Sequence, residues 1–348
     1  MAQPETLADI KKYDASAMID LLESFPEQCR QASKLGEEFD LPRSFRTGYS
    51  NIVCTGMGGS AIGADIIRSY VSDEAALPIL VNRNYNLPNF VGKDSLVIVS
   101  SYSGNTEETI SAYKDARSRG ARVIAITSGG KIKKLATDDT FPVLTIPGGL
   151  PPRCALGFSS FTFLSVLMKL GVVKDKTCQI DRAINTMQNL KDEFMSQAKL
   201  IARKLYLKYP VIYAGQDHID AVATRWRGQL AENAKTISSS HFIPEMNHNE
   251  IVGWKNPAKS LKDFIVIMLK DSSDHPRISK RMKITKNIIE SLKVETIEVE
   301  SAGKELLERI FSLVYIGDFV SFYLAILNKE DPTPVEKINY LKEELGKV

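Results

Sequence analysis

Runs of apolar residues alternate with longer amphipathic segments through the first half of the chain. Parallel strands are buried on both faces, so each is expected as a short, nearly continuous apolar run that ends at Gly, Pro, Ser or Asn. Such runs predict strands at residues 51–56, 77–83, 95–104, 121–130 and 141–149. Helices are predicted between them at 64–71 and 105–120, and the second begins with acidic residues and ends at Gly120.

The same order of strand, loop and helix returns in the second half of the chain. A helical region over about 181–209 leads to predicted strands at 209–215, 263–271 and 294–300, a helix at 304–328, and a terminal turn with a short helix. Strands that alternate with helices favour an α/β fold with two mostly parallel sheets, each with helices on both faces. We expect an N-terminal domain with a helical segment (1–170), a helical connection (171–205) and a C-terminal domain with a tail helix (206–348).

Composition narrows the class of protein. The 348 residues are 43% hydrophobic and 25% charged, and the net charge of +3 is too small to favour nucleic acid or an acidic membrane as partner. The first residues lack the order of a signal peptide, and no apolar run is judged long enough to span a bilayer. We therefore expect a cytoplasmic protein. Its cysteines lack CxxC spacing and are expected to be reduced: Cys29, Cys54, Cys154 and Cys178.

Residues 100–109, SSYSGNTEET, place several hydroxyl groups between a predicted strand and a predicted helix. The N-terminus of a helix favours an anion, because its first N–H groups are free and the helix dipole is positive there. Ser101, Ser103 and Thr106 add neutral donors, which suit a sugar phosphate that must be released again. The alternative is simple helix capping, for which Ser, Asn and Thr are common.

The stretch CTGMGGSAIGAD (54–65) also follows a strand, and its GMGGSA fits the GxGxxA variant of the dinucleotide fingerprint. The acid expected at the end of the second strand is missing, although Arg83 could serve the 2′-phosphate of NADP. Alternatively, Gly58 and Gly59 let the backbone approach a sugar and Ser60 bonds one of its hydroxyls. A tight turn without a ligand is the third interpretation.

Six stretches, taken together and in this order, resemble the bifunctional phosphoglucose/phosphomannose isomerases of the sugar isomerase (SIS) superfamily. They are GMGGSAIGAD, SYSGNTEET, PPRCALG, AENAK, HNEIVGW and DPTPV followed by LK. The resemblance implies two flavodoxin-like SIS domains, a homodimer, no metal and no cofactor. It also implies hexose 6-phosphate substrates, with glucose 6-phosphate and mannose 6-phosphate interconverted with fructose 6-phosphate through a cis-enediolate.

The resemblance also assigns roles to individual residues. Glu232 in AENAK becomes the base that moves the C2 proton, although by itself it would be taken for a solvated helix carboxylate. Arg153 in PPRCALG becomes the cation beside the enediolate, where the alternative is a surface loop arginine. His248 in HNEIVGW becomes a ring-opening group, expected from the partner subunit. Cys154 is expected to be a packed residue.

Two further positions follow from the C-terminal motif. Lys342 matches the lysine that assists ring opening, with Lys337 as the competing position, and Thr333 is the candidate for the small residue that accepts both C2 epimers. The substrate-binding residues are then Gly58, Gly59, Ser60, Ser101, Ser103, Thr106 and Thr333.

Other functions remain open on the sequence. An NADP-dependent oxidoreductase would use the glycine-rich loop and leave the hydroxyl loop idle. A non-catalytic SIS module would bind a sugar phosphate without turnover. A metal site of His241, His248 and Glu250 has neither an HExxH nor a paired-cysteine pattern to support it.

Overall fold

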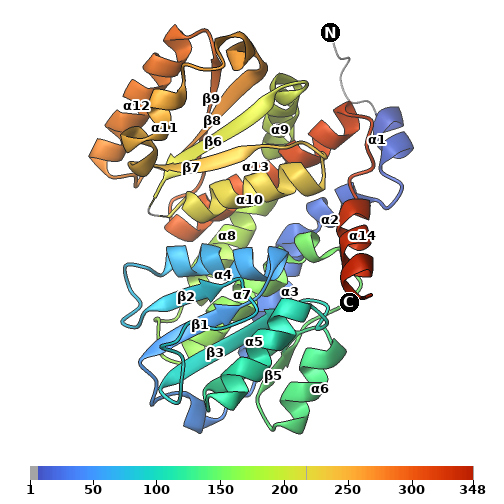
Figure 1. Ribbon diagram of the computed structural model, residues 1–348, viewed down its shortest axis with the longest axis vertical. Helices are drawn as coiled ribbons and strands as arrows, with labels where there is room; N and C mark the ends of the chain where they lie inside the picture. The colour runs from blue at the N-terminus through green and yellow to red at the C-terminus, as the bar shows by residue number, and fades with distance from the viewer. Residues whose placement is uncertain (1–6, 217, 348) are drawn as a thin grey trace.

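The computed structural model describes residues 7–216 and 218–347, and its strands form two parallel sheets, one from each half of the chain (Figure 1). The first sheet has the strand order β2-β1-β3-β4-β5 with every pair parallel. Its strands are β1 (Asn51–Thr55), β2 (Ile79–Asn82), β3 (Ser95–Ser101), β4 (Arg122–Thr127) and β5 (Val143–Thr145). This order is that of flavodoxin-like folds, so the predicted fold class is confirmed.

Helices cover both faces of this sheet because successive strand residues point to opposite sides. On one face Val53 and Val97 pack with residues of α5 and α6. On the other face Ile52 and Ile98 pack with α4, α7 and α3. The helices concerned are α3 (Phe25–Glu38), α4 (Gly58–Tyr70), α5 (Glu107–Ser118), α6 (Gly130–Asp138) and α7 (Leu156–Lys169).

The second sheet has the order β7-β6-β8-β9, again all parallel. Its strands are β6 (Tyr209–Gly215), β7 (Ser239–Ile243), β8 (Phe264–Lys270) and β9 (Glu295–Glu300). α10 (Asp220–Glu232) and α13 (Leu306–Leu327) cover the face toward the first sheet, and α12 (Pro276–Ser291) covers the opposite face. The sequence pattern missed β7, because this edge strand begins with half-buried serines and buries only its last residue.

The two sheets share one apolar core. Ile52 of the first sheet and Ile267 of the second belong to the same hydrophobic cluster, in which α13 lies between the layers (Figure 1). By length and apolarity α13 could cross a membrane, so the expectation that no apolar run is long enough was wrong. The most apolar stretch of α13 is, however, entirely buried inside the protein. The domain boundaries at 170 and 205 stay a prediction, because helices on both sides of them contribute to this shared core.

The remaining elements surround these layers. They are α1 (Leu7–Tyr13), α2 (Met18–Glu23), α8 (Thr177–Asn189), α9 (Lys191–Leu205), α11 (Glu250–Gly253) and α14 (Glu336–Leu345), with 3-10 turns η1 (Arg43–Phe45), η2 (Pro152–Cys154), η3 (Glu245–His248) and η4 (Ala258–Asp263). The predicted helices at 105–120 and 304–328 are confirmed, whereas the helix predicted to begin at residue 64 begins at Gly58. The glycines of the first loop therefore lie in the opening turn of α4.

The strand order also places a crevice. β2 lies on one side of β1 and β3 on the other, so the order in which the strands are added to the sheet reverses between β1 and β3. In open parallel sheets, ligands bind outside the carboxyl ends of the strands at such a switch point. The glycine-rich segment follows β1 and the hydroxyl-rich loop follows β3, so both lie at the carboxyl edge of the sheet beside this switch point.

Candidate active site

The hydroxyl-rich loop joins the end of β3 to the start of α5. Ser101 is 2% exposed, and its hydroxyl donates to the hydroxyl oxygen of Thr106 at 3.2 Å. Thr106 stands at the N-cap of α5 but makes no side-chain cap hydrogen bond, so its hydroxyl does not serve the helix. Ser103 is exposed and its hydroxyl accepts from the backbone N–H of Asn105 at 3.3 Å. The capping alternative therefore does not account for Thr106, and the first turn of α5 keeps free N–H donors.

The opening turn of α4 lies beside this loop. The Ser60 hydroxyl accepts from the backbone N–H of Tyr102 at 3.2 Å, so α4 is fixed to the end of β3. Gly58 has φ +48°, and a Cβ there would meet nothing within 4 Å, so this position is open. A Cβ on Gly59 would lie 2.5 Å from the backbone oxygen of Pro152. Glycine at 59 thus lets η2 pack directly against the start of α4.

That approach brings Arg153 into the site. Its side chain is buried, at 4% exposed, so the interpretation as a surface loop arginine was wrong. Its Nε donates to Oδ1 of Asn233 at 2.5 Å, and its Nη2 donates to the backbone oxygens of Pro332 and Thr333 at 2.6 and 2.8 Å. Its Nη1 is 3.7 Å from Oε2 of Glu232. A guanidinium has five N–H donors, and those of Nη1 have no hydrogen-bond acceptor among the described residues.

Glu232 ends α10 and borders a cavity of about 160 Å³. Gly58, Gly59 and Arg153 also line this cavity. The carboxylate is 32% exposed, so it is accessible to a ligand and yet paired with a buried cation. A larger hollow of about 390 Å³, lined by Arg68, Ser72 and residues 75–79, contains none of the predicted site residues.

The DPTP segment (331–334) contacts both Arg153 and Lys235. Lys235 donates from Nζ to the backbone oxygen of Glu232 at 2.7 Å and to that of Pro332 at 3.2 Å. Burial, with the charge of Arg153 second, lowers the pKa of Lys235 below its usual range. The hydroxyl oxygen of Thr333 is buried without a hydrogen-bond partner among the described residues.

Two predicted residues do not join this group on one chain. His248 is exposed and follows the carboxyl end of β7, whereas Glu232 lies before the amino end of that strand. Five extended residues between them span roughly 16 Å. Lys342 and Lys337 are exposed on α14, and neither has a hydrogen bond or ion pair with a described site residue.

The remaining candidates have structural partners. Arg83 pairs with Asp65 and also lines the cavity that Glu232 borders. His241 and Glu250 are in contact, Nδ1 to Oε2 at 2.8 Å, and within the described residues no group of three His, Cys, Asp or Glu side chains is placed to hold a metal. Burial raises the pKa of Cys154 to about 11, as expected for a packed thiol.

Known proteins match this chain over nearly its whole length. Residues 49–141 match the SIS domain and residues 194–345 match the bacterial phospho-glucose isomerase C-terminal SIS domain. A bifunctional phosphoglucose/phosphomannose isomerase of Caldicellulosiruptor bescii is 42% identical, covering 95% of this chain and 99% of the relative. A bifunctional phosphoglucose/phosphomannose isomerase of Aquifex aeolicus is 39% identical, covering 86% of this chain and 92% of the relative. This chain belongs to the bifunctional phosphoglucose/phosphomannose isomerase family.

Solved structures confirm the fold of this isomerase family member. A hypothetical protein of Thermus thermophilus superposes with a TM-score of 0.72 at 13% identity, covering 94% of this chain and 89% of that one. At that identity only the architecture is shared.

The structure adds residues to which the sequence analysis gave no role. Asn233 and Lys235 both contact the Arg153 and Glu232 group. Both lie in the AENAK motif, so that motif was the available signal. Gly59 has a packing role toward Pro152 that a sugar-binding interpretation did not include.

Proposed function

We propose that this chain interconverts glucose 6-phosphate and mannose 6-phosphate with fructose 6-phosphate by moving a proton between C1 and C2. The observation that carries the proposal is the placement of the Glu232 carboxylate 3.7 Å from an Arg153 nitrogen on the wall of one cavity. An aldose–ketose isomerase needs a base and a charge stabiliser at adjacent points. The names of the relatives support the same reaction.

The chemistry proceeds on the open-chain sugar. The Glu232 carboxylate takes the proton from C2 of the aldose, and the electron pair of that C–H bond forms the C1–C2 double bond. The aldehyde oxygen then carries negative charge beside Nη1 of Arg153. Return of the proton to C1, with transfer of a proton from O2 to O1, gives the ketose. Arg153 suits this role because its charge is fixed and its other donors are already engaged.

The phosphate is assigned to the loop after β3. Ser101, Ser103 and Thr106 provide hydroxyl donors, and the uncapped first turn of α5 provides backbone N–H groups. Glu107 is exposed, so it does not oppose an anion at that position. Ser60 of α4 is hydrogen-bonded to Tyr102 of this loop, and Gly58 lines the cavity with Glu232, so the carbon chain of the sugar is assigned to the space along the start of α4.

A coupled assay tests the reaction. The protein is incubated with fructose 6-phosphate alone, and glucose 6-phosphate and mannose 6-phosphate are measured separately. Both are expected to form, without added nicotinamide cofactor or metal. Binding of fructose 6-phosphate with neither product formed would leave the non-catalytic sugar-phosphate module, and a requirement for NADP would leave the oxidoreductase.

Acceptance of both epimers is assigned to Thr333. Its side chain is short, and its unpartnered hydroxyl lies on the segment held by Arg153. A residue of this size leaves room for the C2 hydroxyl in either configuration. Ring opening is assigned to His248, with Lys342 assisting and Lys337 as the competing position.

The proposed active unit is a homodimer in the cytoplasm, in which His248 of one subunit completes the site of the other. Its exposure and its place at the far end of β7 support this arrangement. α14 also presents exposed apolar side chains, including Ile338 and Leu341, which a second subunit would cover.

Mixed dimers test the shared site. When Glu232→Gln and His248→Ala chains are co-expressed in equal amounts, a hybrid dimer holds one site with both residues intact and one with neither. Half of the dimers are hybrids, so about a quarter of the wild-type turnover is expected, although each variant alone is nearly inactive. Absence of recovered activity, with hybrids demonstrated by native mass spectrometry, would place His248 in its own subunit's site or outside the site altogether.

A further inference from the structure

We propose that Asn233 is a positioning residue for Arg153: its amide fixes the guanidinium so that only Nη1 faces the reacting carbons. This inference rests on the proposed function of Arg153. Asn233 follows the base Glu232 directly in the chain, and its side chain is 0% exposed. Oδ1 of its amide accepts the single N–H of Nε of Arg153 at 2.5 Å.

The orientation of this amide is set by α13. Nδ2 of Asn233 donates to the Ser321 hydroxyl oxygen at 2.9 Å, and that hydroxyl donates its own proton to the backbone oxygen of Asp318 at 2.7 Å. Because the Ser321 proton is already engaged, the hydroxyl must accept, and only the NH2 side of the amide can face it. The carbonyl side is thereby turned toward Arg153.

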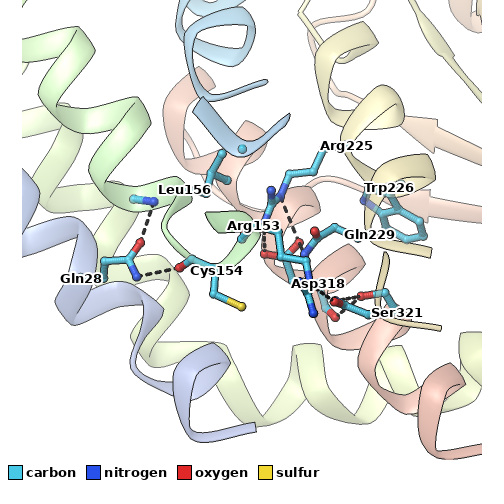
Figure 2. A network of polar contacts seen from close by, with 12 residues as sticks. Gln28, Arg153, Cys154, Leu156, Arg225, Trp226, Gln229, Asp318 and Ser321 are labelled. Atoms are coloured by element: carbon cyan, nitrogen blue, oxygen red, sulfur yellow. Dashed lines mark hydrogen bonds and ion pairs between the residues drawn. The ribbon is translucent and has the colours of Figure 1, made fainter. Parts of the chain in front are cut away.

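The segment that carries Arg153 is held from two further sides. Nη2 of Arg225 donates to the backbone oxygen of Arg153 at 3.1 Å, and Arg225 is itself paired with Asp318 at 2.6 Å in a fully buried ion pair. On the opposite side Nε2 of Gln28 donates to the backbone oxygen of Cys154 at 2.8 Å (Figure 2). These contacts hold the backbone of Arg153 and Cys154 in place, and Asn233 sets the direction of the Arg153 side chain.

This arrangement has a consequence for the reaction. Two of the three guanidinium nitrogens are engaged by Asn233, Pro332 and Thr333, so the plane of the group cannot rotate without breaking hydrogen bonds. Stabilisation of a developing oxyanion requires donors that are already oriented before the reaction. Asn233 therefore acts on the transition state through Arg153, rather than on the binding of the phosphate.

A double-mutant cycle in the full-length protein tests this role. Asn233→Ala is expected to lower kcat by ~10–100-fold with KM for fructose 6-phosphate changed less than ~3-fold, because the loss falls on the transition state. In an Arg153→Ala background, Asn233→Ala is expected to cost less than ~2-fold further, since the residue through which it acts is gone. If the two losses multiply, Asn233 acts independently of Arg153 and the proposal is wrong.

Asn328→Ala is the matched control. Asn328 is a half-buried amide near the same helix end, where its Nδ2 donates to the backbone oxygen of Ala234 at 2.9 Å and to the Thr236 hydroxyl at 3.0 Å without touching Arg153. We expect its kcat to stay within ~2-fold of wild type. If Asn328→Ala lost as much kcat as Asn233→Ala, both losses would come from weaker packing at the end of α10, and the proposal would be overturned.

Ser321→Ala keeps the test decisive if Asn233→Ala does not fold. It leaves Asn233 in place but removes the group that orients its amide, and ~3–10-fold loss of kcat is expected with KM unchanged. Unchanged kcat in Ser321→Ala would contradict the positioning chain. The two proposals fail differently: full activity of Arg153→Ala would remove the role of Arg153, whereas an impaired Arg153→Ala beside a fully active Asn233→Ala would remove only the role of Asn233.

Discussion

Glu232→Gln is expected to lower the turnover of fructose 6-phosphate by ~10²–10⁴-fold, the range for loss of a general base. The amide keeps the shape of the side chain but cannot accept the proton from carbon. KM should change little, because the phosphate is assigned to the loop after β3. Stability should also change little, since the carboxylate is 32% exposed and its nearest cationic nitrogen is 3.7 Å away. Steady-state kinetics with thermal unfolding of the same samples measure both effects.

Glu193→Gln provides the control for this substitution. Glu193 is an exposed helix carboxylate on α9, outside the candidate site. Its variant should retain wild-type turnover. Full turnover by Glu232→Gln under conditions where Glu193→Gln is also active would remove Glu232 from the mechanism.

Arg153→Ala is expected to lower turnover by ~10²–10³-fold, the cost of losing one preorganised oxyanion donor. It should also destabilise the fold, because Oδ1 of Asn233 and the backbone oxygen of Thr333 lose their donor at about 1–3 kcal/mol each where water does not replace it. The backbone oxygen of Pro332 keeps its hydrogen bond from Lys235. Arg153→Lys should recover little activity, since an ammonium cannot match the planar fork that engages Asn233, Pro332 and Thr333 together.

Arg309→Ala separates the catalytic loss from the structural one. Arg309 is also buried, at 8% exposed, and its Nε donates to Oδ2 of Asp271 at 2.9 Å within the second sheet region. Its variant should lose stability but keep the turnover of the folded fraction. Equal losses of turnover in both variants, after correction for folded protein by circular dichroism, would mean that Arg153 matters only for the fold.

Much of the fold was predictable because buried parallel strands carry a local signal. β1, β3, β6 and β8 are nearly continuous apolar runs. β7 lacks that signal, since it lies at the edge of its sheet and buries only its last residue, while the backbone makes the pairing with β6. The start of α4 was placed too late because its opening turn is built from glycines, and these are chosen for close packing and backbone freedom rather than helix propensity.

The candidate site was predictable only in part. Ser101 and Thr106 stand out because hydroxyl groups follow a buried strand, which is a local pattern. Glu232 and Arg153 have no distinguishing local pattern, and family resemblance alone singled them out. The contacts of Arg153 with Asn233 and Pro332 join residues far apart in the sequence, and such pairings depend on how the two sheets pack together. No periodicity along the chain encodes them.

A crystal structure of Glu232→Gln with fructose 6-phosphate bound tests the central claim most directly. The account predicts phosphate oxygens within hydrogen-bond distance of the Ser101 and Thr106 hydroxyls, and C1 and C2 between the residue 232 amide and Nη1 of Arg153. A phosphate held instead by the exposed Arg227 and by Arg83 at the cavity, with C2 out of reach of residue 232, would contradict it.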